Sequence, residues 1–209
     1  PNVVGDPDRT RVRTPEVGHG VFFGSLWWKP NDDAVRNLAV LSQRLTRQGV
    51  RHVFTVAGQG ATDELRRIVA QAGQVDPIGK LELVGFVPDL AALLDRSACA
   101  VLPVLSGGGS MVKLIDAMRL GVPVLTTPQG ARGISGLTHG THLQVVPLGP
   151  AFDATCADML SRPGDYEPMA TRGQEFVADR FSLTALESLV RDLVSRLRSA
   201  VPSAADGTS

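Results

Sequence analysis

The feature that most constrains the fold is a repeated alternation of short, apolar, β-rich runs with longer helical segments. The runs are near-continuous stretches of Val, Leu and Phe, at residues 20–25, 52–58, 81–87, 99–104, 122–127 and 142–148. Strands of this composition are buried on both faces, and helical crossovers between them make the sheet parallel. The sequence therefore predicts an α/β fold, a doubly wound, Rossmann-like parallel sheet of about six strands with helices on both faces.

The segments between these runs have the spacing of amphipathic helices. In the first, apolar residues recur on one helical face between residues 35 and 45, and we expect Asn31 to cap its N-terminus and Gly49 to end it. After residue 150 the pattern is helical, and residues 20–199 are predicted to form one domain. The small, polar segment 200–209 is expected to be a disordered tail.

Composition and charge exclude several classes of function. Lys and Arg total 21, as do Asp and Glu, so no net charge favours nucleic acid or an anionic membrane surface. No apolar stretch is long enough to span a bilayer, no signal peptide is visible, and two cysteines do not make a disulfide framework. We therefore expect a cytoplasmic protein that does not bind nucleic acid.

The stretch "SGGGSMVKLIDAMRLG" (106–121) places three glycines between the fourth expected strand and a helix at 110–120. A glycine in a regular element costs roughly 0.5–1 kcal/mol relative to alanine, so the triplet indicates a tight turn or close approach of a ligand. Ligands of a doubly wound sheet bind at the carboxyl ends of the strands, where bare N–H groups of helix N-termini bind phosphate. We interpret Gly107, Gly108 and Gly109 as part of such a cradle.

The helix after the glycines carries Lys113 and Asp116, three residues apart. Its apolar residues follow the i, i+3, i+4, i+7 pattern of a sheet-facing stripe, so we expect Lys113 and Asp116 to point away from the core. A first-turn lysine adds a positive charge for the same anion, and the aspartate can accept hydrogen bonds from a sugar diol. The alternative is a tight turn followed by an ordinary surface pair at i, i+3.

Other motifs are weaker indications of function. The stretch "AGQGATDEL" (57–65) resembles a dinucleotide-binding fingerprint, but Asp63 stands where the third glycine belongs and would repel a phosphate. The two histidines of "THGTH" (138–142) lack further ligands nearby, so we expect no metal site. Trp27 and Trp28 are expected to pack or to contact another domain rather than to stack on a ligand.

Two stretches, "FFGSLWWKPNDDAV" and "ELVGFVPDLAALLDRSACAVLPVLSGGGSMVKLIDAMRLGVPVLTTPQGARGI", resemble the C-terminal, nucleotide-sugar-binding half of a family 4 (group 1) glycosyltransferase of the GT-B fold. The likeness runs to about residue 197. The opening "PNVVGDPDR" resembles the linker that enters this half, which makes residues 1–19 an interdomain linker segment and residues 20–199 the donor-binding domain. The resemblance implies an N-terminal acceptor-binding domain absent from this chain. Any association with the inner membrane is expected to depend on that domain.

The resemblance also implies roles for loops at the sheet edge. Gly24 and Ser25 match the loop that approaches the diphosphate, and Phe86 with Val87 match the segment beside the nucleobase. The backbone from Gly108 through Gly109 and Ser110 to Met111 matches the segment that cradles sugar and phosphates.

Three charged residues complete the implied site. Asp116 matches the later of two family acids, the one expected to hold the ribose hydroxyls, whereas the earlier position is Gly108. Lys113 fits the "GGGT-x-x-K" pattern of some branches and is expected to act in catalysis. Lys29 is the basic residue near the first helix that could face the diphosphate.

The resulting expectation is retaining transfer of a sugar from a nucleoside-diphosphate sugar to an acceptor, without a metal or cofactor. Backbone donors and a lysine that bind the departing diphosphate more tightly in the transition state accelerate its departure. Two alternatives stay open: a nucleotide-sugar epimerase of the same fold, and a non-catalytic domain that keeps only the fold. The residues do not identify the nucleobase, the sugar or the acceptor.

Overall fold

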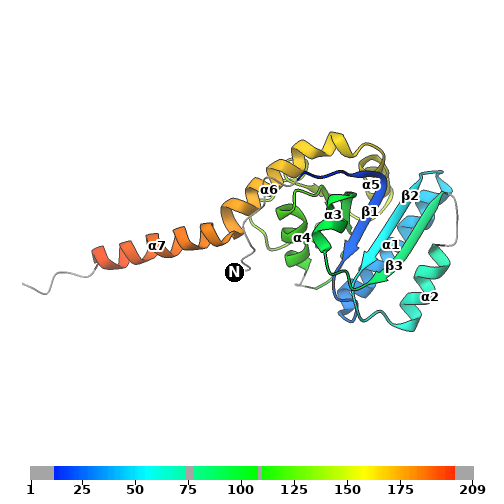
Figure 1. The fold of residues 1–209 in the computed structure, drawn as a ribbon, viewed down its shortest axis with the longest axis horizontal. Helices are drawn as coiled ribbons and strands as arrows, with labels where there is room; N and C mark the ends of the chain where they lie inside the picture. The colour runs from blue at the N-terminus through cyan, green and yellow to red at the C-terminus, as the bar shows by residue number, and fades with distance from the viewer. Residues whose placement is uncertain (1–11, 74–77, 108–109, 201–209) are drawn as a thin grey trace, which may run out of the picture.

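The structure, a computed structural model, describes residues 12–73, 78–107 and 110–200. Within these residues one parallel sheet has the strand order β3-β2-β1-β4-β5-β6. Figure 1 shows the neighbouring strands β3, β2 and β1. The strands are β1 (Glu16–Phe23), β2 (His52–Ala57), β3 (Gly79–Gly85), β4 (Ser97–Leu102), β5 (Val124–Thr126) and β6 (Gln144–Val145). The doubly wound sheet predicted from the apolar runs is confirmed.

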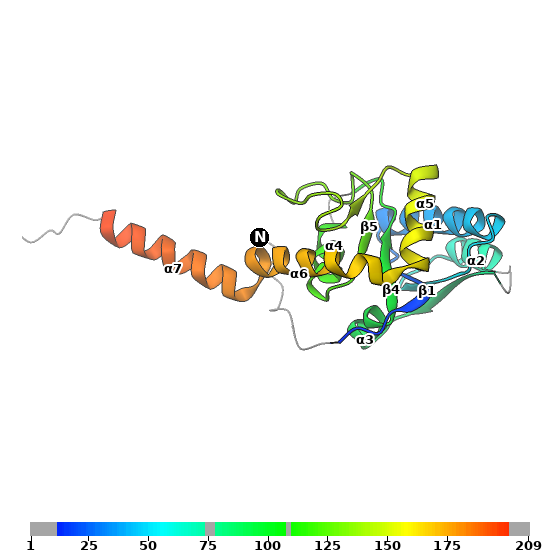
Figure 2. The same cartoon turned by 90° about the horizontal axis from the view of Figure 1, so that it is seen from above.

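Helices cover both faces of the sheet, as right-handed crossovers in opposite directions from its centre require. Figure 2 shows α1 and α5 on one face and α3 on the other. The helices are α1 (Lys29–Arg47), α2 (Asp63–Ala72), α3 (Leu90–Asp95), α4 (Ser110–Arg119), α5 (Pro150–Ser161), α6 (Glu167–Phe181) and α7 (Leu183–Ala200), with a 3-10 turn, η1 (Pro163–Tyr166).

The core lies on both sides of the central strands, as their composition predicts. All six residues of β4 are buried, and Phe22 of β1 and Phe54 of β2 are fully enclosed. The stripe of α1 between residues 35 and 45 packs into this core, as expected. Burial of each such large side chain contributes about 1.5–3 kcal/mol, so the core fixes the sheet edge on which the site is built.

Several boundaries differ by a few residues from the expected ranges; β3, for example, spans Gly79–Gly85 rather than 81–87. The starts of β1 and α1 differ for identifiable reasons. Strand β1 begins at Glu16, four residues before the apolar run, because Glu16 pairs with β4 across a register shift between Glu16 and Gly20. Helix α1 begins at Lys29, with Pro30 in its first turn, and its N-cap is Trp28. The prediction that Asn31 caps this helix is wrong, since Asn31 already lies inside it.

Helix α7 projects away from the sheet in both views (Figures 1 and 2). It exposes a row of apolar side chains, at Leu183, Val190, Leu193 and Val194. Among the described residues, no helix has the length and apolarity needed to cross a membrane.

Candidate functional site

The strand order reverses between β1 and β4, which are neighbours in the sheet although α1 leads from β1 toward β2 and α4 leads from β4 toward β5. The loops after these two strands therefore diverge, and in this class of sheet the crevice lies outside the carboxyl ends of two such strands, here β1 and β4. Such a switch point is where doubly wound sheets bind ligands. Four of the predicted residues lie at this switch point. Gly24 and Ser25 are in the loop after β1, Gly107 is in the loop after β4, and Lys113 is in α4.

Lys113, in the first turn of α4, is buried with 6% of its surface exposed. Its Nζ donates a hydrogen bond to Oδ1 of Asn31 at 2.5 Å and lies 5.5 Å from the centroid of the Phe22 ring. The expectation that Lys113 points away from the core is therefore wrong. The helical period identified the side chains that face the sheet, as Leu114 and Ile115 do, but it could not show that Asn31, near the start of α1, lies next to the Lys113 ammonium.

The charge of Lys113 has no acidic partner among the described residues. Burial lowers the pKa of its ammonium to about 8, and burial is the cause of the whole shift. The surface pair with Asp116, considered as an alternative from the sequence, does not form, since Lys113 donates instead to the neutral amide of Asn31. The site thus contains a buried positive charge that is held by a hydrogen bond but not neutralised.

The loop after β1 lies directly against this lysine. Gly24 has φ +143°, and a Cβ built on it would lie 2.9 Å from Nδ2 of Asn31 and 3.1 Å from Cε of Lys113. The Nδ2 group of Asn31 also donates to the carbonyl oxygen of Ser25 at 2.7 Å. The structure therefore brings Gly24, Ser25 and Lys113 together. It adds Asn31, for which the sequence predicted only a role in helix capping.

The first glycine of the triplet has a structural reason of its own. Gly107 has φ +88°, and a Cβ there would lie 2.6 Å from Cγ of Pro30, so glycine allows the loop after β4 to pack on the start of α1. The close approach at Gly107 is to the protein itself. Gly108 and Gly109 lie outside the described residues, and Ser110 and Met111 contribute to the first turn of α4.

The glycines of the fingerprint-like stretch 57–65 also serve contacts between loops. A Cβ at Gly58 would lie 1.9 Å from the carbonyl oxygen of Gly24, and one at Gly60 would lie 2.9 Å from Cδ1 of Trp27. The amide of Gly24 donates to the carbonyl of Ala57 at 2.9 Å. The loop after β2 therefore supports the loop after β1, which accounts for these glycines without a dinucleotide.

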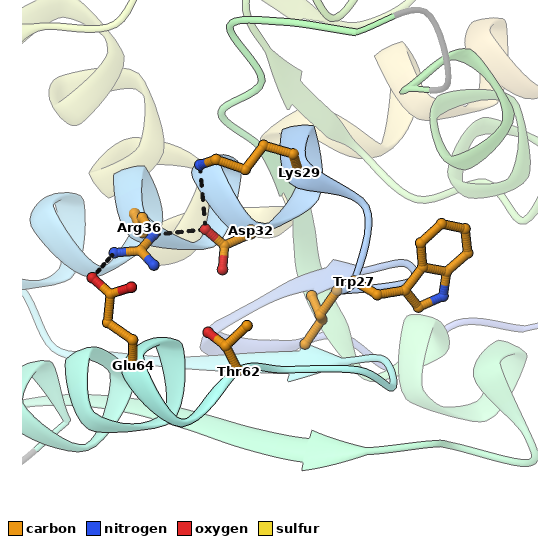
Figure 3. Close-up of a pocket in the computed structure, with 7 residues that line it drawn as sticks. Trp27, Lys29, Asp32, Arg36, Thr62 and Glu64 are labelled. Carbon is orange, nitrogen blue, oxygen red and sulfur yellow. Dashed lines mark hydrogen bonds and ion pairs between the residues drawn. The ribbon is translucent and has the colours of Figure 1, made fainter.

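Lys29 is not brought to Lys113. Its ammonium forms ion pairs with Asp32, at 3.7 Å, and with Asp33. Lys29 and Asp33 lie on the side of α1 away from Asn31, and Asp32 lies about 100° from Asn31, because about 100° separates successive residues of a helix. Figure 3 shows Lys29 directed toward Asp32 there.

This outer face of α1 borders a pocket of about 460 Å³, lined by Leu26, Trp27, Lys29, Asp32, Arg36, Thr62 and Glu64 (Figure 3). Arg36 bridges its two sides: Nε lies 2.7 Å from Oδ2 of Asp32, and Nη1 lies 3.1 Å from Oε1 of Glu64. The guanidinium lowers the pKa of the Glu64 carboxyl through this hydrogen bond. The charges of the pocket are thus paired with one another.

The structure does not bring the remaining predicted residues to Lys113. Asp116 is half-buried one turn further along α4, where burial raises the pKa of its carboxyl. Phe86, 67% exposed, and Val87, half-buried, follow β3, which is separated from β1 by β2. Trp27 and Trp28 stand partly exposed at the rim, edge to face at 6.3 Å.

The histidines of 138–142 are engaged by the backbone. Nδ1 of His139 accepts from the amide of Val145, and Nδ1 of His142 accepts from the amide of Thr138. Across the described parts of the chain, no three His, Cys, Asp or Glu side chains gather as a metal site.

Comparison with known families gives one match. A family model described as "Glycosyl transferases group 1" matches residues 19–161, which contain β1 to β6 and the crevice almost entirely. A search of curated proteins gives no match.

Solved structures share the fold at low sequence identity. S. aureus TarM superposes with a TM-score of 0.69 at 11% identity, over 91% of this chain and 37% of TarM. Anabaena HepE, solved in complex with UDP and glucose, gives 0.66 at 14% identity, over 86% of this chain and 48% of HepE. Sucrose-phosphate synthase from Thermosynechococcus elongatus gives 0.66 at 18%, over 90% of this chain and 47% of the synthase. The chain thus spans less than half the length of these proteins.

Proposed function

The chain belongs to the group 1 glycosyltransferases, and from this premise we propose that it is the donor-binding half of a retaining enzyme of that family. In this proposal the crevice between β1 and β4 binds a nucleoside-diphosphate sugar, and an acceptor-binding domain outside this chain presents the acceptor. The complex of HepE with UDP and glucose supports this class of donor. Family membership favours sugar transfer over the epimerase alternative.

One observation carries the proposal: the buried, unneutralised ammonium of Lys113 at the switch point. A buried charge without a partner of opposite sign is unfavourable, so its retention calls for a function. A diphosphate at this position would supply the missing negative charge. The N-terminus of α4, in whose first turn Lys113 lies, adds its partial positive charge for the same anion.

The same arrangement suits the chemistry of sugar transfer. When the bond between the anomeric carbon and the diphosphate breaks, negative charge grows on the departing diphosphate oxygen. Lys113 and the amides at the start of α4 bind that charge more tightly in the transition state than in the ground state, which lowers the barrier. We assign the ribose to Asp116, and the nucleobase to the segment of Phe86 and Val87. The loop of Gly24 and Ser25 is assigned to the diphosphate.

Isothermal titration calorimetry tests the proposal. Uridine and guanosine diphosphate are titrated into the wild-type chain and into Lys113→Met. A charge-assisted hydrogen bond contributes about 1.5–3 kcal/mol, so we expect roughly 10- to 150-fold weaker binding in the variant. Lys80→Met, which removes an exposed lysine paired with Glu82 on β3, is the control and should bind as the wild type does.

Two results would contradict the proposal. Absence of heat with any nucleoside diphosphate would favour the third possibility, a domain that retains only the fold. Equal affinity of the wild type and Lys113→Met would remove Lys113 from the site.

A further inference from the structure

We propose that Asn31 is a positioning residue for Lys113, which it holds at the junction of the loops after β1 and β4 without neutralising its charge. The inference rests on the proposed function, because it concerns how Lys113 is presented to a diphosphate. Asn31 would act through Lys113 rather than on the substrate itself.

Both ends of the Asn31 side chain are engaged, which fixes its orientation. Its Oδ1 accepts from the Lys113 ammonium at 2.5 Å, and its Nδ2 donates to the carbonyl of Ser25 at 2.7 Å. An ammonium can only donate and a carbonyl can only accept, so the two partners determine which way the amide points. Asn31 is also 5% exposed, and its backbone amide bonds the carbonyl of Trp28 at 2.8 Å. This side chain has little freedom to move.

The neutrality of the amide matters as much as its position. A carboxylate at residue 31 would form an ion pair with Lys113 and would oppose the binding of an anion to the same ammonium. Acidic side chains do follow in the sequence, at Asp32 and Asp33, but they pair with Lys29 and Arg36 on the other face of α1. The inward-facing position thus has an acceptor of hydrogen bonds that carries no charge.

Asn31 also couples Lys113 to the predicted diphosphate loop. Its Nδ2 lies 2.9 Å from where a Cβ of Gly24 would be, so the side chain packs beneath that loop as well as bonding it. A ligand that contacted both this loop and Lys113 would find the two already fixed relative to each other by Asn31. Fixing them before binding reduces the reorganisation that binding requires.

The first test compares three variants by titration with uridine and guanosine diphosphate. Asn31→Ala removes both bonds, and we expect about tenfold weaker binding. Asn31→Asp keeps the shape but supplies a negative charge, and should weaken binding at least as much. The matched control is Asn37→Ala: Asn37 lies on the same helix, is half-buried, and donates to the carbonyl of Pro103 in the loop after β4 at 3.0 Å, away from Lys113. Its removal should leave affinity unchanged.

The second test observes Lys113 without ligand. The chain has three lysines, Lys29, Lys80 and Lys113, so ¹³C labelling of lysine gives few signals, and Lys113→Met assigns the one of interest. A hydrogen-bond acceptor or a negative charge near an ammonium favours its charged form. In pH titrations of the ¹³Cε shift we therefore expect Asn31→Ala to lower the pKa of Lys113 and Asn31→Asp to raise it. Asn37→Ala should leave it unchanged.

The combination distinguishes positioning from general support of the fold. In Asn31→Asp, the pKa of Lys113 should rise while the affinity for diphosphate falls. General destabilisation of the fold does not produce these two changes together. Equal losses of affinity in Asn31→Ala and Asn37→Ala, or an unaltered Lys113 titration in Asn31→Ala, would overturn the inference. A wild-type chain that binds no nucleoside diphosphate would instead refute the proposed function, and the Lys113 titration would still decide whether Asn31 positions it.

Discussion

The two faces of α1 handle charge in opposite ways. On the outer face, Lys29, Asp32, Arg36 and Glu64 surround a pocket, and each cation has a carboxylate partner. On the inner face the ammonium of Lys113 bonds the neutral amide of Asn31 and lies over the Phe22 ring, with no carboxylate partner among the described residues. The outer pocket has more charged groups, but they satisfy one another. If the proposed function holds, the anion binds at the buried charge that lacks a counter-charge, and not in the cavity whose charged residues are already paired.

The position of the two faces relative to the sheet explains this contrast. The inner face lies over the switch point between β1 and β4, where burial is deep enough to lower the pKa of Lys113 to about 8. The outer face lies toward solvent, where the exposed Glu64 and Lys29 are screened by water. Substitutions on the inner face should therefore have large effects, and substitutions on the outer face small ones.

The largest effect is expected from Gly24→Val, which disturbs the inner face. The new side chain would meet Asn31 and Lys113 at about 3 Å and would occupy an unfavourable φ of +143°. Strain and overpacking together should lower the free energy of unfolding by roughly 2–5 kcal/mol, and nucleoside-diphosphate binding should be lost. Chemical denaturation and calorimetry measure both.

Gly49→Val is the control for backbone strain. Gly49 has φ +74° and no atom within 4 Å of its Cβ position, so this variant should lose stability but keep affinity. Loss of affinity in both variants to the same degree would show that the inner face has no special role.

The next effect is a pH dependence of stability that originates in Lys113. The pKa of the Lys113 ammonium is about 8 in the folded protein, whereas the ordinary value for a lysine is 10.5. Between these two pH values the unfolded chain therefore binds more protons than the folded protein does. The free energy of unfolding therefore rises with pH between these two values, by roughly 3 kcal/mol in total. Below this window the full cost of burying the charged ammonium lowers the stability of the folded protein. Denaturation at pH 7, 8, 9 and 10 should show this rise in the wild type relative to Lys113→Met; parallel curves would mean that Lys113 is not held in a desolvated site.

The smallest effect is expected from Glu64→Gln on the outer face. This change removes the exposed partner of Arg36 but leaves Asp32 bonded to the guanidinium. Thermal denaturation and diphosphate affinity should both match the wild type. A marked loss of affinity would mean that the outer pocket, and not the crevice at Lys113, holds the anion.

The fold could be read from the sequence because each signal was local. The apolar runs of the strands and the helical stripes of α1 and α4 depend only on residues close in the sequence, and they placed Gly24, Gly107 and Lys113 at one edge of the sheet. The start of β1 was missed because Glu16 and His19 interrupt the apolar pattern. Glu16 pairs with β4, which lies about 80 residues away in the sequence, and His19 pairs with Val53 of β2.

The arrangement of the site could not be read in the same way. The helical period of α4 sets its sheet-facing residues, but whether Lys113 meets solvent or another side chain depends on where Asn31, near the start of α1, lies relative to it. Asn31 resembled an N-cap because it precedes Asp32 and Asp33. A signal was nevertheless present: Pro30 favours the first turn of a helix, which places the cap before it and frees the Asn31 side chain for another partner.

The contact between Gly58 and the carbonyl of Gly24 has an evolutionary consequence. Residue 58 touches no proposed ligand, yet any side chain there would displace Gly24 and, through it, the amide that holds Lys113. If the site binds a donor as proposed, relatives that retain donor binding should have no larger residue at position 58. Among related sequences, we expect glycine at position 58 to occur together with glycine at position 24, and to be replaced only in proteins that have lost catalysis.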